Sequence, residues 1–192
     1  MESNQSLKKQ LYIKKMFILI GLPRSGKTTM REIILNRFFH IVPVSADDLR
    51  YEIYNQRYWQ GGEDQVWLFR KHHLNSLMKY GITILIDETN TTKKRRDSLL
   101  KLCDFYGYTP IYIFVDTDKE ICIERANKID DKYIIPIIEH QSKQFEIPVF
   151  EEIKQFKFSV ITHVDNCNFD SFDFSIFIQE FRAELKNYDL KK

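Results

Sequence analysis

The stretch FILIGLPRSGKTTM, residues 17–30, runs from four apolar residues into a loop with two glycines, followed by a lysine and two threonines. Its second half completes the pattern G-x-x-x-x-G-K-[ST], in which glycines let successive backbone N–H groups approach a phosphate. The pattern follows an expected strand and precedes an expected helix, whose N-terminus adds partial positive charge. The stretch therefore predicts a site for a nucleoside triphosphate.

The same pattern assigns roles to individual side chains. The Lys27 ammonium is expected to reach the β- and γ-phosphates of ATP, and the Thr28 hydroxyl to be a ligand of Mg²⁺. Switches, motors and kinases share such a loop, so it does not by itself identify the reaction. The expected nucleotide-binding residues are Gly21, Leu22, Pro23, Arg24, Ser25, Gly26, Lys27, Thr28 and Thr29.

Short aliphatic blocks alternate with longer amphipathic segments along the chain. The blocks occupy residues 16–20, 40–44, 82–86, 110–115 and 156–164, and the segments of helix length 27–38, 47–60, 63–79, 93–105 and 119–128. Continuous aliphatic runs favour strands covered on both faces, and their alternation with helices favours a parallel sheet. We predict one α/β domain over residues 1–192, with a core at 15–165 and a C-terminal helix at 170–188.

Composition limits the class of protein. The chain has 192 residues, 43% of them hydrophobic, and a formal net charge of +2, so no strongly basic surface requires a nucleic-acid partner. Cys103, Cys122 and Cys167 lie far apart without CxxC spacing, which favours ordinary reduced thiols. No apolar run approaches the roughly 18 residues of a membrane span, and we expect a soluble cytoplasmic protein.

Two acids and an arginine follow the second aliphatic block, in VSADDLR, residues 44–50. Ser45 can cap the helix that starts there, and a carboxylate of Asp47 could accept a proton from an attacking hydroxyl. Arg50, one helical turn later, would hold an anionic acceptor. Alternatively, the acids only complement the helix dipole and Arg50 is solvated. The nearby nucleotide loop favours the catalytic interpretation, because both lie at the carboxyl ends of strands.

The third block ends in ITILIDETN, which places Asp87 where a carboxylate can hold Mg²⁺ through water. Glu88 competes for this role. Thr89 and Asn90 are expected to organise the turn through bonds between side chain and backbone. The run KKRR, residues 93–96, is expected to form a solvated face rather than to contact an anionic acceptor.

Aromatic residues surround a glycine pair in RYWQGGEDQVW, residues 57–67. The two glycines interrupt two expected helices near the presumed acceptor site. Tyr58, Trp59 and Trp67 could stack on a base, but core packing is the more common environment of such rings.

Together, GLPRSGKTT, SADDLR, DETNTTKKRRDSLLKLCDFYGY and FVDTDKEICIERANK followed by YIIP resemble the polynucleotide 5′-kinase family and related small P-loop kinases. The resemblance covers residues 16–150. It implies a P-loop kinase fold with a parallel sheet in the order 2-3-1-4-5, flanked by helices and closed by a lid. It makes Asp47 the general base, Arg50 the ligand of the acceptor phosphate and Arg125 the start of a lid over residues 125–136.

The lid departs from the family pattern, which carries a further arginine shortly before a proline. Between Arg125 and Pro136 this chain offers only Lys128 and Lys132, and lysine is a poorer geometric substitute. Arg24 could supply the missing cation, but we expect it to point to solvent because the loop binds through its backbone.

The sequence thus predicts an ATP-dependent kinase with Mg²⁺ as cofactor and the 5′-OH of DNA or RNA as favoured acceptor. Its predicted catalytic residues are Asp47, Lys27, Arg50 and Arg125, and its predicted metal ligands are Thr28 and Asp87. Alternative acceptors are a small hydroxyl metabolite, a nucleotide sugar as in the zeta-toxin group, or a modified DNA base. An ATP-binding regulatory protein without an acceptor is the alternative of another class. The acceptor and the oligomeric state stay open.

Overall fold

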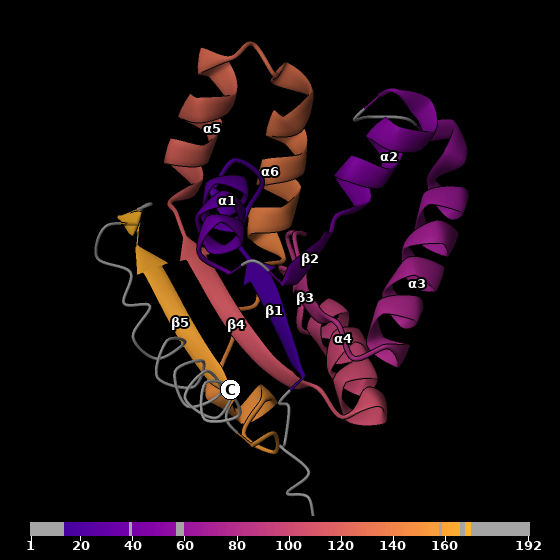
Figure 1. Ribbon diagram of the computed structural model, residues 1–192. Helices are drawn as coiled ribbons and strands as arrows, with labels where there is room; N and C mark the ends of the chain where they lie inside the picture. The colour runs from indigo at the N-terminus through magenta and orange to yellow at the C-terminus, as the bar shows by residue number, and fades with distance from the viewer. Residues whose placement is uncertain (1–13, 39, 57–59, 158, 166–167, 170–192) are drawn as a thin grey trace, which may run out of the picture.

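The computed structural model describes residues 14–38, 40–56, 60–157, 159–165 and 168–169. Its centre is a five-stranded sheet whose neighbouring strands all run parallel, in the order β2-β3-β1-β4-β5 (Figure 1). The strands are β1 (Lys15–Ile20), β2 (Ile41–Val44), β3 (Thr83–Ile86), β4 (Thr109–Asp116) and β5 (Val160–Asp165). The predicted α/β class and the predicted strand order are confirmed.

Helices connect the strands, because parallel neighbours need long crossovers. They are α1 (Lys27–Arg37), α2 (Ala46–Tyr54), α3 (Glu63–Lys79), α4 (Lys93–Tyr106), α5 (Lys119–Lys128) and α6 (Ile135–Lys143), with short 3₁₀ turns η1 (Gln60–Gly62), η2 (Lys132–Ile134) and η3 (Phe150–Glu152). Helix α2 is shorter than predicted. It ends at Tyr54, and the C-cap Asn55 has a left-handed φ of 54° and donates its N–H to the Tyr51 carbonyl oxygen.

Strand β5 also begins later than predicted, at Val160 rather than at residue 156. The segment before it is folded into a turn, in which the Ser159 hydroxyl donates to the carbonyl oxygens of Ile153 (2.8 Å) and Phe156 (2.9 Å). Phe156 therefore packs beside the core without joining the sheet. The predicted helix at 170–188 lies outside the described residues.

Both faces of the sheet are covered, which explains the continuous aliphatic runs. Alternate residues of β1 point to opposite faces, and all six are buried. On one face Met16, Ile18 and Ile20 share a core with Leu74 and Met78 of α3 and with Leu99, Leu100 and Cys103 of α4. On the other face Phe17 and Leu19 share a core with Met30 and Ile34 of α1.

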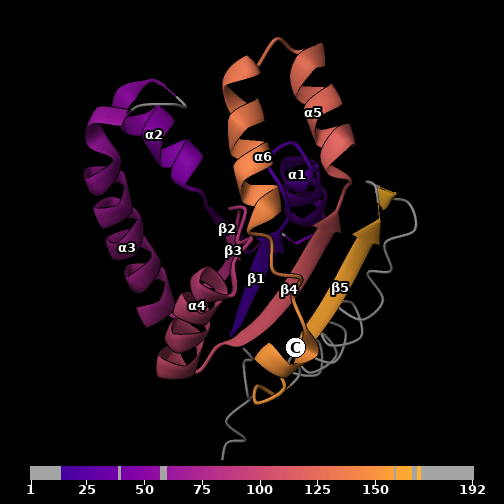
Figure 2. The ribbon, with the colours of Figure 1, turned by 180° about the vertical axis from the view of Figure 1, so that it is seen from behind.

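The carboxyl ends of the strands lie at one edge of the sheet, where the segments that follow β1 to β4 meet. In the two opposite views of Figures 1 and 2, the α2–α3 pair and the α5–α6 hairpin extend from this same end. The fold therefore gathers the loop of residues 21–26, the start of α2 and the turn after β3 into one neighbourhood.

Three further findings concern only the described ranges. None of their helices is long and apolar enough to cross a membrane. They contain no group of three or more His, Cys, Asp or Glu residues placed to hold a metal ion. Cys103 and Cys122 are buried, and burial raises the pKa of the Cys103 thiol to about 12. Cys167 lies outside these ranges.

Candidate active site

The loop between β1 and α1 follows a tight path that depends on glycine. A Cβ at Gly21 would lie 2.6 Å from the Val115 carbonyl oxygen and 2.7 Å from the Ser25 Oγ. Gly26, with φ of 106°, is the N-cap of α1, and Arg24 also has a left-handed φ of 64°. The loop therefore wraps closely around the N-terminus of α1, the geometry that a phosphate site needs.

Segments far apart in the sequence hold the main chain of this loop. The Gly21 N–H donates to the Thr89 carbonyl oxygen at 3.0 Å. The Thr117 hydroxyl donates to the Ser25 carbonyl oxygen at 2.9 Å, and the Arg125 guanidinium donates to the same oxygen at 3.1 Å. The loop is thus fixed between the turn after β3 and helix α5.

Lys27 lies over this loop. Its Nζ donates to the carbonyl oxygens of Gly21 (3.1 Å) and Leu22 (2.6 Å), and the side chain is buried. Thr28 and Thr29 are exposed in the first turn of α1, where backbone N–H groups lack partners within the helix. A glycine loop, a helix N-terminus, an ammonium and an exposed hydroxyl form a set that fits a triphosphate with magnesium.

Asp87 lies at the end of β3 beside the loop, with its side chain only 9% exposed. Its N–H donates to the Val44 carbonyl oxygen at 3.0 Å, which joins the ends of β3 and β2. The Arg31 guanidinium lies 3.4 Å from the Asp87 carboxylate and 2.6 Å from that of Asp48. Burial raises the pKa of Asp87, although the charges of Lys27 and Arg31 oppose this rise.

Glu88, the competing candidate for the metal, has a different partner. Arg70 of α3 binds its carboxylate through two nitrogens, with 3.0 Å between Nη2 and Oε2, and both side chains are nearly buried. Burial raises the pKa of Glu88, and the Arg70 charge opposes the rise. Glu88 is thus bound by Arg70, whereas Asp87 lies beside Arg31 and the Lys27 charge of the loop.

The structure separates the two acids at the start of α2. Ser45 caps this helix, as predicted, by accepting a bond from the Asp48 N–H at 3.2 Å. Asp48 pairs with Arg31, whereas the Asp47 side chain is 71% exposed and pairs with Arg50.

Arg50 is not the solvated residue that one interpretation of the sequence allowed. Its side chain is 14% exposed and pairs with both Asp47 and Glu63, with 3.0 Å between Nη2 and the Glu63 Oε2. The hydrogen bond with Glu63 is the main cause that raises the pKa of Arg50. Sequence reasoning missed Glu63 and Arg70, because their partners lie 13 and 18 residues away on other elements.

The segment expected to form the lid is a helical hairpin of α5, η2 and α6. The expectation that Arg24 points to solvent is wrong, because Arg24 forms an ion pair with Asp131 in this hairpin and its side chain is 29% exposed. The two lysines that replace the expected second arginine lie on the surface, Lys128 at 2.7 Å from Glu124 and Lys132 at 3.0 Å from Asp130.

The basic run at the start of α4 is only partly the solvated face that was predicted. Lys93, Lys94 and Arg95 are exposed, but Arg96 is fully buried. Its Nε and Nη2 each donate to a Glu152 carboxylate oxygen at 2.8 Å. The positions 96, 99, 100 and 103 form a buried stripe at helical spacing, a signal in the sequence that could have identified Arg96 as an inward-facing residue.

The turn after β3 is organised by the side chain of Asn90, one of the two residues predicted for this role. Its Nδ2 donates to the carbonyl oxygens of Leu19 (2.8 Å) and Glu88 (3.2 Å), and its own carbonyl oxygen accepts a bond from Arg96 at 3.1 Å. Asn90 has a left-handed φ of 45°, which asparagine tolerates better than most residues. The turn is therefore bonded to the end of β1, directly before the glycine loop.

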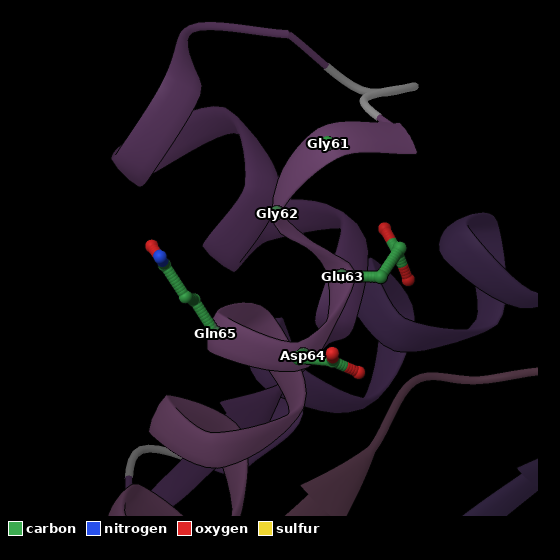
Figure 3. A pocket seen from close by; sticks show the side chains of 5 residues that line it. All are labelled: Gly61, Gly62, Glu63, Asp64 and Gln65. Atoms are coloured by element: carbon green, nitrogen blue, oxygen red, sulfur yellow. The ribbon is translucent and has the colours of Figure 1, made fainter.

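Trp67 was predicted to pack in the core, but it lies at the surface. Its side chain is 37% exposed, its Nε1 donates to Glu63 at 3.2 Å, and its ring lies 5.5 Å from the Arg70 guanidinium carbon. Nearby, an open hollow at the junction of η1 and α3 is lined by Gly61, Gly62, Glu63, Asp64 and Gln65 (Figure 3). Tyr58 and Trp59 lie outside the described residues.

Known proteins resemble both the sequence and this fold. Among curated proteins, 2′,3′-cyclic-nucleotide 3′-phosphodiesterase of Mus musculus is 29% identical in an alignment of 112 residues that covers 52% of this chain. The match spans only 23% of the length of that relative.

Two solved structures share the fold. A structure described as a putative kinase from Chloroflexus aurantiacus superposes with a TM-score of 0.64 and 15% identity, over 90% of this chain and 96% of its own. A chain of the Pnkp1/Rnl/Hen1 RNA repair complex superposes with a TM-score of 0.57 and 18% identity, over 73% of this chain and 50% of its own. The fold is therefore that of the P-loop kinases.

A family model described as an AAA domain matches residues 16–133. The matched range includes the glycine loop, both acids at the start of α2, the turn after β3 and Arg125. Because the match covers more than half of the chain, the protein belongs to this AAA domain family of P-loop proteins.

Proposed function

We propose that the protein is an ATP-dependent kinase that transfers the γ-phosphoryl group to the 5′-OH of DNA or RNA. The observation that carries this proposal is the exposed Asp47 carboxylate, paired with Arg50 at the sheet edge that also bears the glycine loop. A phosphate loop alone is compatible with switches and motors, whereas a carboxylate that can accept the proton of an acceptor hydroxyl is a feature of kinases that phosphorylate hydroxyl groups.

Residues 21–29 form the donor part of the proposed site. The backbone N–H groups of the loop and of the first turn of α1 would surround the phosphates of ATP. The Lys27 ammonium, which hydrogen-bonds two loop carbonyls in this structure, would neutralise the β- and γ-phosphates. Arg125, bonded to the loop carbonyls, would stabilise the hairpin that closes over the nucleotide.

Magnesium would be held by the Thr28 hydroxyl and, through water, by Asp87. The burial of Asp87 beside Lys27 and Arg31 supports this assignment, because a buried carboxylate favours a nearby cation. When bound, the ion reduces the negative charge of the phosphate oxygens during transfer.

At the acceptor part, Asp47 would accept the proton of the acceptor hydroxyl. The acceptor oxygen then forms a bond to the γ-phosphorus while the bond between this phosphorus and the ADP oxygen breaks. Arg50, next to Asp47, would hold a phosphate of the acceptor. Positioning of the two substrates and electrostatic stabilisation would provide most of the rate acceleration.

A nucleic-acid acceptor is supported by the charges around this part of the site and by the resemblance to polynucleotide 5′-kinases. Lys93, Lys94 and Arg95 are exposed at the start of α4, directly after the turn that carries Glu88. The Arg95 charge acts on the Glu88 carboxyl, so this basic strip borders the acceptor side. Exposed cations of this kind bind the phosphates of a polynucleotide backbone.

The proposal is tested with magnesium, γ-labelled ATP and a panel of acceptors. The panel contains 5′-OH single-stranded DNA, 5′-OH RNA, hydroxymethylated duplex DNA and a pool of small hydroxyl metabolites. Asp47→Asn should lower the rate of labelling by about 100-fold to 10,000-fold, the usual effect of losing a general base. Asp48→Asn is the matched control, because it removes the adjacent charge, which pairs with Arg31 instead.

Label on 5′-OH ends that disappears only in Asp47→Asn supports the proposal. Label only on metabolites or on modified bases would retain the phosphoryl transfer and overturn the proposed acceptor. ATP binding without any labelled acceptor would favour a regulatory ATP-binding protein. Equal losses in the two aspartate variants would contradict the assignment of Asp47 as the base.

A further inference from the structure

Arg50, the proposed ligand of the acceptor phosphate, is already held by two carboxylates. Its Nη1 donates to Asp47, while its Nε and Nη2 donate to Glu63. All three nitrogens of the guanidinium are therefore engaged, although the group keeps N–H donors beyond these three bonds. A phosphate that approaches Arg50 therefore meets two negative charges, those of Asp47 and Glu63, beside one positive charge. Only Asp47 has a proposed role in taking the proton from the acceptor, so the Glu63 charge needs another explanation.

The position of Glu63 is fixed by the junction between α2 and α3. A Cβ on Gly62 would lie 2.0 Å from the Tyr54 hydroxyl, so a larger residue there would displace the Tyr54 side chain that packs against this junction. Glu63 follows directly as the first residue of α3, and Figure 3 shows its side chain and that of Gln65 projecting to opposite sides. The junction thus brings the Glu63 carboxylate to the Arg50 side of α3.

Glu63 also contacts a second group. Its Oε2 accepts the bonds from both the Arg50 Nη2 (3.0 Å) and the Trp67 Nε1 (3.2 Å). The hydrogen bond from Arg50 is the main cause that lowers the pKa of Glu63, so this carboxyl is ionised at neutral pH. The pair lies at the surface, with the Glu63 side chain 37% exposed. An exchange of partners there does not require the core to open.

Helix stabilisation alone does not explain this contact. Acids in the first turn of α3 interact favourably with the helix dipole, but Asp64 at the next position does the same and is exposed. Glu63 differs from Asp64 in its two bonds to Arg50. Comparing a substitution of Glu63 with one of Asp64 therefore distinguishes a general effect of negative charge from the specific effect of the ion pair with Arg50.

We infer that Glu63 sets the affinity of the acceptor site for phosphate: its carboxylate occupies Arg50 until a phosphate on the 3′ side of the reacting nucleotide replaces it. This inference rests on the proposed function, in which Arg50 binds the acceptor. An acceptor that carries such a phosphate displaces Glu63, whereas a nucleoside leaves the ion pair intact. Glu63 is thus a specificity-determining residue that acts through Arg50.

The first test measures equilibrium binding to the full chain by calorimetry, without ATP. The probes are thymidine 3′-monophosphate and thymidine. Glu63→Gln should bind the monophosphate about threefold to tenfold more tightly than the parent, because a competing charge is lost, with thymidine unaffected. Glu63→Asp, which keeps the charge but shortens its reach, should give a smaller gain, and Asp64→Asn should give less than half of the gain of Glu63→Gln.

The second test separates KM from kcat in the labelling assay with an oligonucleotide acceptor. Glu63→Gln should lower the acceptor KM by the same factor and leave kcat and the KM for ATP unchanged, whereas a purely structural role would raise KM or lower kcat. Adding Arg50→Gln should abolish the gain. Equal or weaker binding of the monophosphate by Glu63→Gln, or no binding by either protein, overturns the inference.

The two proposals fail in distinguishable ways. If no acceptor is labelled but Glu63→Gln still binds the monophosphate more tightly, the proposed reaction is wrong and the role of Glu63 stands. If 5′-OH ends are labelled by the parent chain while Glu63→Gln leaves both monophosphate affinity and acceptor KM unchanged, the reaction stands and the role of Glu63 is wrong.

Discussion

The proposed donor and acceptor parts of the site are built from different kinds of contact. Around the glycine loop, the contacts end on main-chain atoms, as in the bonds from Gly21 to Thr89 and from Arg125 to the loop carbonyls. Around α2 and α3, the contacts join side chains, as in the pairs of Arg50 with Glu63 and of Arg70 with Glu88. Main-chain contacts depend on backbone shape, whereas ion pairs can be changed one residue at a time.

The difference suggests how such a fold changes its acceptor. Substitution of a loop side chain leaves the loop carbonyl oxygens that accept these bonds in place, so the donor part keeps one chemistry. Replacement of Glu63 or Arg70 alters the charge presented to the acceptor without altering the loop. Variation of acceptors on a shared phosphate loop is then a property of α2 and α3.

The largest effect is expected at the ion pair of Arg96 with Glu152. This pair joins side chains, like the pairs around α2 and α3, but it is fully buried. Arg96 and Glu152 form a bidentate ion pair at 2.8 Å, and Tyr112 also donates to Glu152. Arg96→Met should lower the free energy of unfolding by about 3–5 kcal/mol, because it leaves a carboxylate buried without its counter-ion. Denaturation with urea measures this loss.

The control for this prediction is the double variant Arg96→Met with Glu152→Met. It should recover most of the stability, since replacing a buried pair by apolar residues is often neutral. A single variant that loses less than about 1 kcal/mol would show that the pair contributes no more than a surface ion pair does, contrary to its burial.

The next effect concerns the donor part. Gly21→Ala would place a Cβ 2.6 Å from the Val115 carbonyl oxygen, so the loop must shift. A displacement of this kind should weaken ATP binding by about 100-fold, because the loop N–H groups lose their alignment. Calorimetry with ATP and magnesium measures the loss.

Gly107→Ala is the matched control, since Gly107 also has a positive φ but its Cβ would meet no atom within 4 Å. It should cost about 1 kcal/mol of stability and leave the affinity for ATP unchanged. A similar loss of ATP affinity in both variants would contradict a specific role of the loop shape.

The contrast between the two parts also explains what could be predicted from the sequence. The loop, the five strands and the lengths of α3 and α5 follow from local signals: the glycine pattern, aliphatic runs and amphipathic spacing. The capping role of Ser45 and the turn at Asn90 were equally local, because Ser45 bonds to the Asp48 N–H and Asn90 to the Glu88 carbonyl oxygen, both close in sequence.

The missed features are pairs between distant elements. Arg24 with Asp131, Arg70 with Glu88 and Arg96 with Glu152 join residues 107, 18 and 56 positions apart. Residue type reveals only that each group carries a charge, and the partner depends on how helices cross. Solvation is the usual expectation for such residues, and it failed where packing placed two opposite charges together.

A smaller effect is expected at Asp87, where substitution should increase stability but reduce activity. Burial raises its pKa in the folded protein, so the folded protein holds this proton to higher pH than the unfolded chain does. Stability therefore falls as pH rises from the ordinary carboxyl pKa through the raised value. Asp87→Asn should raise Tm at pH 7 by about 1–4 °C, and this gain should shrink near pH 4 as Asp87 becomes protonated.

Thermal unfolding at both pH values, with labelling measured in parallel, tests this prediction. Asp87→Asn should lose the magnesium-dependent labelling while it gains stability, and the exposed Glu139→Gln should change neither by much. A lower Tm at pH 7 would mean that the contact with Arg31 outweighs the burial of the charge.

The smallest effect is expected at the ion pair of Arg24 with Asp131, a contact between side chains that involves the glycine loop of the proposed donor part. The ion pair of Arg24 with Asp131 ties the loop to the α5–α6 hairpin and is partly exposed. Arg24→Ala should raise the KM for ATP by up to about fivefold, the range of a partly exposed pair, and combining it with Asp131→Ala should add little more. Lys128→Ala, which breaks the surface pair with Glu124 in the same hairpin, should leave this KM unchanged. If Arg24→Ala instead equals Gly21→Ala, the hairpin contact is as important for ATP as the loop backbone. The donor part would then depend on side chains as much as the acceptor part does.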